Sequence, residues 1–299
     1  MDIRVLQYFL AVAREESITR AAETLNMTQP PLSRQLKDLE EEVGKQLLIR
    51  GSKKVTLTED GMLLRKRAEE MIALMEKTKS ELSSSDENIS GEIHMGSGET
   101  EAVSTIAKVA KDLQEEYPLI RYHIYSGDAE HIVDRLDKGL IDFGLLVEPF
   151  DISKYDFIRL PVKDTWGVLM RKDSPLAKKE SICAEDLWDK PLILSHQTAI
   201  SDDMVAWLRK DVSQLNIVAT YDLLYNASRF VKMGFGYAIA LDKLINTSGD
   251  SNLCFRPLYP VSEAGLCIVW KKYQVFSRAA GRFMQKLKDE FASVSYTHL

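Results

Sequence analysis

A short stretch near the N-terminus concentrates side chains that can form hydrogen bonds with nucleotide bases and phosphates. Arg34 can pair with guanine and Gln29 with adenine, each through two hydrogen bonds. The hydroxyl groups of Thr28 and Ser33 and the ammonium group of Lys37 suit contacts to phosphate. Phosphate contacts position a protein on DNA without specifying a sequence. The stretch therefore has the chemistry of a nucleic-acid reader, provided that one element presents all five side chains together.

A helix starting at Gln29 would present these side chains together. Pro30 and Pro31 then fall in its first turn, where a missing N–H costs little, and Gly44 is placed to end it. Two earlier helices are expected, the second capped by Ser17, with a tight turn before Thr28. The apolar residues of the three helices recur at helical spacing: Leu6, Phe9, Leu10, Val12, Ala13; Ala21, Ala22, Leu25; Leu32, Leu36, Leu39, Val43. This arrangement predicts a helix-turn-helix whose last helix, including Pro30, enters the major groove.

Two short β-prone runs follow, between Leu47 and Leu57, and they flank the turn sequence Gly-Ser-Lys-Lys. A hairpin directly after a helix-turn-helix is a wing, so Arg50, Lys53 and Lys54 are expected on the flanking DNA backbone or in the minor groove. From Asn26 to Thr58 there are six basic and four acidic residues, a local charge of +2 in a chain of −6. The acids lie late in the third helix, which predicts that they point away from the duplex.

One long helix is expected from Thr58 to about Ser84, with Thr58-Glu59-Asp60 as its N-terminal cap. Its heptad positions alternate in spacing between four and three residues: Leu64, Ala68, Met71, Met75, Thr78 and Leu82. Such a seam favours pairing with the same helix of a second chain. The alternative is a stripe packed on its own domain.

The pattern changes after the small polar segment 83–88, which is typical of a linker. Strands are expected at 93–96, 120–125, 141–147, 166–170, 191–195, 217–220, 236–241 and 266–270, and helices at 100–117, 129–136, 202–210, 222–233 and 275–291. Strands alternating with helices imply parallel pairing and two α/β lobes. The strand left over at 266–270 favours a return of the chain to the first lobe.

The stretch from Phe9 to Gly61 resembles the signature of the LysR-type transcriptional regulators. The matching residues are Ser17-Ile18-Thr19, Ala21-Ala22, Leu25, Thr28-Gln29-Pro30, Leu32-Ser33, Leu39-Glu40, Gly44, Arg50, Leu57-Thr58 and Gly61. Leu48 departs from the pattern, because the family usually has phenylalanine there. Gly91, the segment 140–142 and the segment 233–236 resemble landmarks of the family's sensor domain.

The resemblance implies an α/β fold class with three parts: an N-terminal winged helix-turn-helix, a long dimerisation helix, and a two-lobed effector domain like a periplasmic binding protein. The expected limits are 1–58 for the DNA-binding domain, 59–88 for the dimerisation helix and linker, 89–162 with 265–299 for lobe I, and 163–264 for lobe II. A small-molecule effector would bind in the cleft between the lobes and modulate the DNA contacts. Effector identity, target genes and the sign of regulation do not follow from the sequence.

The effector site is expected at the carboxyl ends of strands and at helix N-termini. The candidate residues are Ser97, Gly98, Glu99, Thr100, Glu101, Ser126, Val147, Ser195, His196, Thr198 and Asn226. Glu99 and Glu101 would repel a carboxylate, which favours an effector with a cationic or hydrogen-bond donor group over a simple small dicarboxylate. The alternative is that both acids only interact with the dipole of the helix that follows them.

The expected partners are double-stranded DNA with an interrupted palindrome, the effector, and a second copy of the chain in a homodimer that could assemble into a tetramer. RNA polymerase is a further candidate partner. A dimer places two reading helices one helical turn or more apart on DNA, which is why the palindrome should be interrupted.

Other functional classes find little support in the sequence. The five histidines show no metal-ligand spacing, no catalytic or nucleotide-binding motif occurs, and no cofactor is expected. The N-terminus lacks the pattern of a signal peptide, and no apolar run is long enough for a membrane helix, so a cytoplasmic protein is expected. A solute-binding receptor without a transcriptional role would suit the two lobes but does not explain the helix-turn-helix. A DNA-architectural protein does not explain the net charge or the large sensor portion.

The three cysteines, Cys183, Cys254 and Cys267, form no C-x-x-C pair and are expected to be buried small side chains, with a redox switch as the alternative. The last six residues, 294–299, break the pattern of the closing helix. They resemble one reading frame of a transposon end used in sequencing libraries, which predicts that they are not native.

Overall fold

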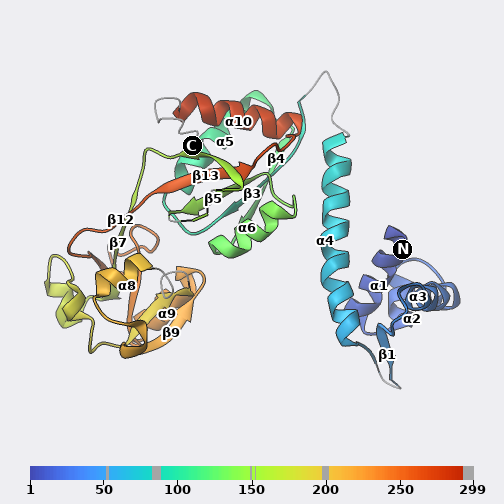
Figure 1. Ribbon diagram of the computed structural model, residues 1–299, viewed down its shortest axis with the longest axis horizontal. Helices are drawn as coiled ribbons and strands as arrows, with labels where there is room; N and C mark the ends of the chain where they lie inside the picture. Colours follow the sequence, from blue (N-terminus) through green and yellow to red (C-terminus); the bar gives the residue numbers. More distant parts are fainter. Residues whose placement is uncertain (52–53, 83–88, 149, 152, 197–201, 292–299) are drawn as a thin grey trace. The chain divides into compact units, whose positions relative to one another are not determined.

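A computed structural model describes residues 1–51, 54–82, 89–148, 150–151, 153–196 and 202–291, and the chain divides into two compact units, Met1–Leu82 and Ser83–Leu299 (Figure 1). The closing hexapeptide 294–299 lies outside the described residues. Among the described residues, no helix is long and apolar enough to span a bilayer.

The first unit is a winged helix-turn-helix followed by a long helix. Its elements are α1 (Ile3–Glu15), α2 (Ile18–Thr24), α3 (Gln29–Val43), β1 (Leu48–Arg50), β2 (Val55–Leu57) and α4 (Glu59–Leu82). The Ser17 side chain caps α2 by accepting the backbone N–H of Arg20. Gly44, with φ of +66°, ends α3 in the left-handed region that glycine adopts at little cost. These boundaries agree with the capping signals in the sequence.

The core of this unit forms between the three helices and the wing. It consists of Phe9, Val12, Ala21, Ala22, Leu32, Leu36, Leu39, Leu47 and Leu48. Leu48, which departs from the family pattern, is thus buried. Val43 was expected on the apolar face of α3 but is 37% exposed. It is the last residue of the helix, where the chain turns away from the core toward the wing.

Hydrogen bonds between side chains and the backbone fix the wing and the start of α4. Glu40 Oε1 accepts the N–H groups of Leu47 and Leu48, at 2.7 and 2.9 Å. Thr58 Oγ1 donates to the Gln46 carbonyl at 2.7 Å and accepts the N–H of Gly61 at 3.0 Å, so Thr58 caps α4 as expected. A Cβ on Gly61 would lie 2.1 Å from the Leu47 carbonyl oxygen, so only glycine fits this approach.

The first half of α4 packs its apolar side chains against the winged helix-turn-helix. Leu64 contacts the core of the unit, and Ala68 is buried. Farther along, Met71, Leu74 and Leu82 are 37, 42 and 81% exposed. The second half of the helix therefore has exposed apolar side chains, although Lys77 within it is buried.

The second unit holds two mixed sheets. The first has the strand order β4-β3-β5-β13-β6. Its elements are β3 (Gly91–Ser97), α5 (Val103–Glu116), β4 (Ile120–Ser126), α6 (Ala129–Asp137), β5 (Phe143–Val147), β6 (Tyr155–Arg159), β13 (Leu266–Lys271) and α10 (Arg278–Phe291). Helices α5 and α10 pack together on one face of this sheet and α6 covers the other face (Figure 1).

The second sheet has the order β11-β7-β10-β8-β9, with β12 beside β7. Its elements are β7 (Asp164–Arg171), η1 (Pro175–Lys178), η2 (Ala184–Asp186), β8 (Leu192–Ser195), α8 (Asp202–Leu208), η3 (Val212–Gln214), β9 (Ile217–Tyr221), α9 (Leu224–Lys232), β10 (Tyr237–Leu241), β11 (Leu253–Pro257) and β12 (Glu263–Ala264). The chain then returns to the first sheet, where β13 pairs with both β5 and β6.

The pairing differs from the all-parallel expectation. Strands β3, β4 and β5 are parallel, as are β8, β9 and β10, but β7, β11 and β13 run antiparallel to their neighbours. The strands β6, β11 and β12 were not expected from the sequence at all. No helix follows them directly to mark a β-α repeat.

Candidate functional site

The outward face of α3 gathers most of the residues expected to bind DNA. A shallow surface hollow is lined by Gln29, Pro30, Ser33, Arg34, Lys37, Asp38 and Glu41. The inward face buries Leu32, Leu36 and Leu39, each at most 2% exposed. Because these leucines are fixed in the core, the residues at the intervening positions must face solvent.

Thr28 is the N-cap of α3, in an extended conformation, and its side chain forms no capping hydrogen bond. Pro30 and Pro31 provide no N–H in the first turn. Backbone donors for a phosphate are therefore fewer than at an ordinary helix N-terminus. The hydroxyl groups of Thr28 and Ser33 are the polar groups placed to compensate.

The expectation that the acids of α3 point away from this face is wrong for two of them. Asp38 and Glu41 line the same hollow as Arg34, and Lys37 Nζ lies 3.3 Å from Glu41 Oε1. Residues three and four positions apart share one side of a helix, which the sequence reading overlooked. Glu40, in contrast, points inward and holds the wing.

On the wing, Arg50 Nη1 donates to Ser33 Oγ at 3.4 Å, and its Nη2 lies 3.7 Å from Glu40 Oε2. Arg50 thus lies beside α3 rather than at the tip of the hairpin. Lys54 Nζ lies 3.2 Å from Glu16 Oε2. Lys53, the third expected wing contact, lies outside the described residues.

In the second unit, the carboxyl ends of three parallel strands meet at one edge of the first sheet. Ser97 pairs in register with Ser126 on β4 and with Leu145 on β5, two positions before Val147. Ser97 is buried and donates through Oγ to the Gly98 carbonyl at 2.6 Å, whereas Ser126 is exposed. The candidate residues of lobe I therefore share one end of the sheet.

Glu99 reaches an element of the second sheet. Its Oε2 accepts the backbone N–H of Leu224, the first residue of α9, whose N-cap residue Leu223 provides no side-chain cap. Glu99 therefore stabilises the N-terminus of α9 rather than that of the helix after it. Glu101 is exposed, and its Oε1 accepts a hydrogen bond from Ser104 at 3.0 Å.

The neighbouring Thr100 also bonds across to the second sheet. Its Oγ1 donates to Asp164 Oδ2 at the start of β7, and both residues are buried. Burial raises the pKa of the Asp164 carboxyl, while the hydrogen bond from Thr100 opposes that shift and the nearby Asp242 adds to it. Sequence reasoning missed Asp164, since a single acid before an apolar run carries no signal of its partner.

The candidates on the second sheet lie at the ends of β8 and β9. Ser195 pairs in register with Tyr221, which precedes α9. His196 Nε2 lies 3.4 Å from Thr220 Oγ1 and 3.6 Å from Asp222 Oδ1. Asn226 is exposed in the first turn of α9, the helix that Glu99 caps. Thr198 lies outside the described residues.

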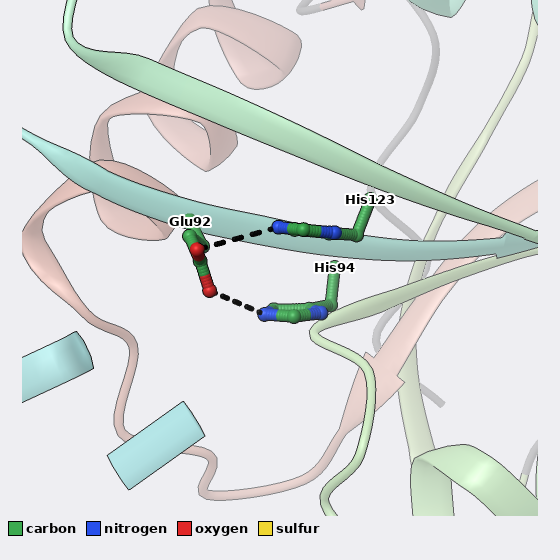
Figure 2. A group of neighbouring side chains, drawn as sticks. All are labelled: Glu92, His94 and His123. Atoms are coloured by element: carbon green, nitrogen blue, oxygen red, sulfur yellow. Dashed lines mark ion pairs between the residues drawn. The ribbon is translucent and has the colours of Figure 1, made fainter. Parts of the chain in front are cut away.

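One further group of polar side chains lies outside both regions. Glu92, His94 and His123 come together across β3 and β4, with ligand-type atoms within 4.8 Å of one another (Figure 2). The sequence spacing predicted no metal site, because the two histidines are brought together by strand pairing rather than by a local motif.

Replacement of Asp164 by asparagine tests the buried carboxyl. The folded-state pKa lies above the ordinary value of 3.8, so the folded state holds the proton more tightly and the free energy of unfolding falls as pH rises through this range. Asparagine does not ionise. Urea unfolding should therefore show the stability of Asp164→Asn rising relative to the parent between about pH 4 and about pH 7.

The exposed Asp250 provides the control, since Asp250→Asn should leave the pH dependence unchanged. A stability difference between Asp164→Asn and the parent that stays constant with pH would contradict this reading of the buried carboxyl.

Each of the two units matches a known protein family. Residues 3–62 match the family model of the bacterial regulatory helix-turn-helix protein, lysR family, and residues 86–292 match that of the LysR substrate binding domain. The chain is 28% identical over 302 residues to the Hca operon transcriptional activator HcaR of Escherichia coli strain K12, covering 99% of this chain and all of the relative. It is 39% identical over 143 residues to the transcriptional regulator BsdA of Bacillus subtilis strain 168, covering 48 and 49% of the two chains.

Among solved structures, full-length CbnR complexed with its target DNA superposes with a TM-score of 0.75 at 16% identity, covering 97% of this chain and 99% of CbnR. Likeness at this identity shows the shared fold: a helix-turn-helix, a long helix and a two-sheet domain like a periplasmic binding protein. The family models between them match nearly the whole chain, so the chain belongs to the LysR family of DNA-binding transcriptional regulators with an effector-binding domain, a family of regulators rather than enzymes.

Proposed function

We propose that α3 reads DNA bases through Arg34 and Gln29, while Thr28, Ser33 and Lys37 contact phosphates and Pro30 packs at the same helix end. The observation that carries this proposal is the shared hollow on the exposed face of α3. Arg34 is exposed and has no ion pair with any residue that the structure describes, so its guanidinium is available to a guanine.

Arg50, Lys53 and Lys54 contact the flanking backbone or the minor groove. Arg50 is held beside Ser33, which suits a phosphate next to the base-reading helix. Lys37 and Lys54 must exchange their acidic partners, Glu41 and Glu16, for phosphate on binding. Both ion pairs are exposed and therefore weak, so the exchange costs little.

Replacement of Arg34 by alanine should weaken binding to DNA from immediately upstream of the chain's own gene by at least about tenfold and relax sequence preference at one position. Fluorescence anisotropy of labelled duplexes measures both effects. Arg121→Ala makes the same change in net charge on an exposed strand of the other unit and should leave affinity within about twofold of the parent. Equal affinities of Arg34→Ala and the parent would show that Arg34 does not read DNA.

We further propose that the chain forms a homodimer through the second half of α4. The exposed Met71, Leu74 and Leu82 support this, because Met71 and Leu82 are two positions of the heptad seam. Two reading helices would then require a target that is an interrupted palindrome. Assembly of such dimers into a tetramer is consistent with the same geometry.

Met71→Glu places one charge per chain in the proposed seam and should raise the dimer dissociation constant by at least about 100-fold, because a buried unpaired charge costs several kcal/mol. Sedimentation equilibrium measures the change. Ala73→Glu adds the same side chain at an exposed position of α4 off the seam and should leave the dimer intact. If the parent chain is monomeric, or if both variants dissociate to the same extent, this seam is ruled out.

The effector, on our proposal, binds between the two sheets at Ser97, Gly98, Glu99, Thr100, Glu101, Ser126, Val147, Ser195, His196, Thr198 and Asn226. Support comes from the placement of the described members at the carboxyl ends of strands or beside α9. Glu99 already accepts a backbone N–H. An effector group with hydrogen-bond donors or positive charge could share this carboxylate, whereas a simple dicarboxylate would be repelled.

Effector binding would shift the balance between arrangements of the two lobes and so change the DNA contacts of the dimer. The adjacent bonds from Glu99 to Leu224 and from Thr100 to Asp164 connect the two sheets and are the contacts that such a shift would alter. The corresponding domain limits are 1–58, 59–88, 89–162 with 265–299, and 163–264. Action in the cytoplasm, with RNA polymerase as a further partner, fits this role.

A further inference from the structure

A cluster of two histidines and one glutamate lies on β3 and β4, in the first sheet of the second unit (Figure 2). Strands β3 and β4 are parallel, and their register pairs His94 directly with His123. Glu92 lies two residues before His94 and therefore on the same face of the sheet. The three side chains are brought together by backbone pairing, which makes their proximity a fixed property of the sheet.

The geometry of the cluster is convergent. The imidazole rings of His94 and His123 are stacked with their centroids 4.6 Å apart and 11° between their planes. Nε2 of His94 lies 3.5 Å from Glu92 Oε2, and Nε2 of His123 lies 3.5 Å from Glu92 Oε1. Figure 2 shows both rings directed at the one carboxylate. The two imidazole nitrogens thus face the two oxygens of one carboxylate, and the ligand-type atoms of all three residues lie within 4.8 Å of one another.

Burial makes this arrangement unlike a set of solvated surface charges. The side chain of His94 is only 10% exposed, while those of Glu92 and His123 are 32 and 42% exposed. Nε2 of His123 is itself buried and forms no hydrogen bond with the residues that the structure describes. A buried imidazole nitrogen aimed at a carboxylate, yet too far away for a good hydrogen bond, is placed to receive another partner.

Neighbouring groups hold the backbone and the ring of His94. The backbone N–H of His94 donates to Asp142 Oδ2 at 2.8 Å, so that carboxylate is engaged with the main chain. The Tyr125 ring also stacks with His94, at 6.2 Å between ring centroids, and the Arg135 guanidinium lies 4.1 Å from the Tyr125 ring centroid. The Arg135 guanidinium is therefore placed against the Tyr125 ring.

We propose that Glu92, His94 and His123 bind a divalent transition-metal ion of the zinc class. Two imidazoles and one carboxylate suit zinc, nickel or cobalt, whereas magnesium and calcium prefer sites made of oxygen ligands alone. The three ligands leave a coordination position for water, since Glu92 and His123 are partly exposed. The site is separate from the proposed DNA-binding and effector-binding residues.

Coordination of zinc needs only a small rearrangement of the three side chains. A tetrahedral zinc ion with bonds of about 2.0–2.1 Å places its ligand atoms about 3.3 Å apart. The carboxylate already lies 3.5 Å from both nitrogens, so the main movement is a closer approach of atoms that now span up to 4.8 Å. Rotation of the partly exposed side chains of Glu92 and His123 can provide this movement while His94 stays in place.

Isothermal titration calorimetry of zinc chloride into the untagged, EDTA-dialysed full chain tests the proposal. We expect one zinc ion per chain, and Glu92→Gln and His123→Asn should each weaken its affinity by at least about tenfold. Both positions are partly exposed, so the variants should fold, and their melting temperatures without metal verify this. Magnesium chloride should give no comparable binding.

Two control variants separate this site from other zinc ligands. His131→Asn removes a histidine that is 72% exposed and lies on α6, and Cys183→Ser removes the partly exposed thiol; neither should change the affinity. Cobalt substitution provides a second readout, because thiolate ligation would add near-ultraviolet charge-transfer bands that nitrogen and oxygen ligands do not produce. Absence of zinc binding, unchanged affinity in Glu92→Gln and His123→Asn, or thiolate bands from cobalt would each overturn the proposal.

Discussion

The burial of three leucines on one face of α3 is the constraint on which the DNA-binding function depends. Leu32, Leu36 and Leu39 pack among α1, α2 and the wing, and each is essentially excluded from solvent. Their burial fixes the rotation of the helix, so Arg34 and Lys37 cannot face anywhere but outward. Burying each leucine contributes about 1.5–3 kcal/mol, more than a single surface hydrogen bond or ion pair would. The orientation of the reading face is therefore determined by the core, before DNA is present.

A second constraint links the two sheets of the effector-binding domain. Consecutive residues of one turn, Glu99 and Thr100, each form a hydrogen bond with an element of the second sheet. The bond from Thr100 involves a buried carboxyl, for which loss of the partner would leave an unsatisfied polar group. This turn already bonds to the second sheet, so a ligand that binds there is well placed to change the arrangement of the two sheets. A new hydrogen bond to Glu99 must compete with the existing one.

Much of the fold could be predicted from the sequence, since periodicity and capping are local. The helices of the first unit, the caps at Ser17 and Thr58 and the alternation of strands and helices all followed from such patterns. What could not be predicted depends on contacts between distant segments. The antiparallel strands, the bond between Thr100 and Asp164, and the pairing of His94 with His123 arise from sheet register. The placement of Asp38 beside Arg34 was within reach of helical spacing and was missed.

Footprinting on DNA from upstream of the chain's own gene, with and without a metabolite extract, tests the central claim most directly. The account predicts protection of an interrupted palindrome whose half-sites lie a whole number of helical turns apart, with boundaries that change when extract is added. A folded, dimeric chain that protects no such site at moderate salt, or a footprint that fractionated extracts never alter, would contradict it.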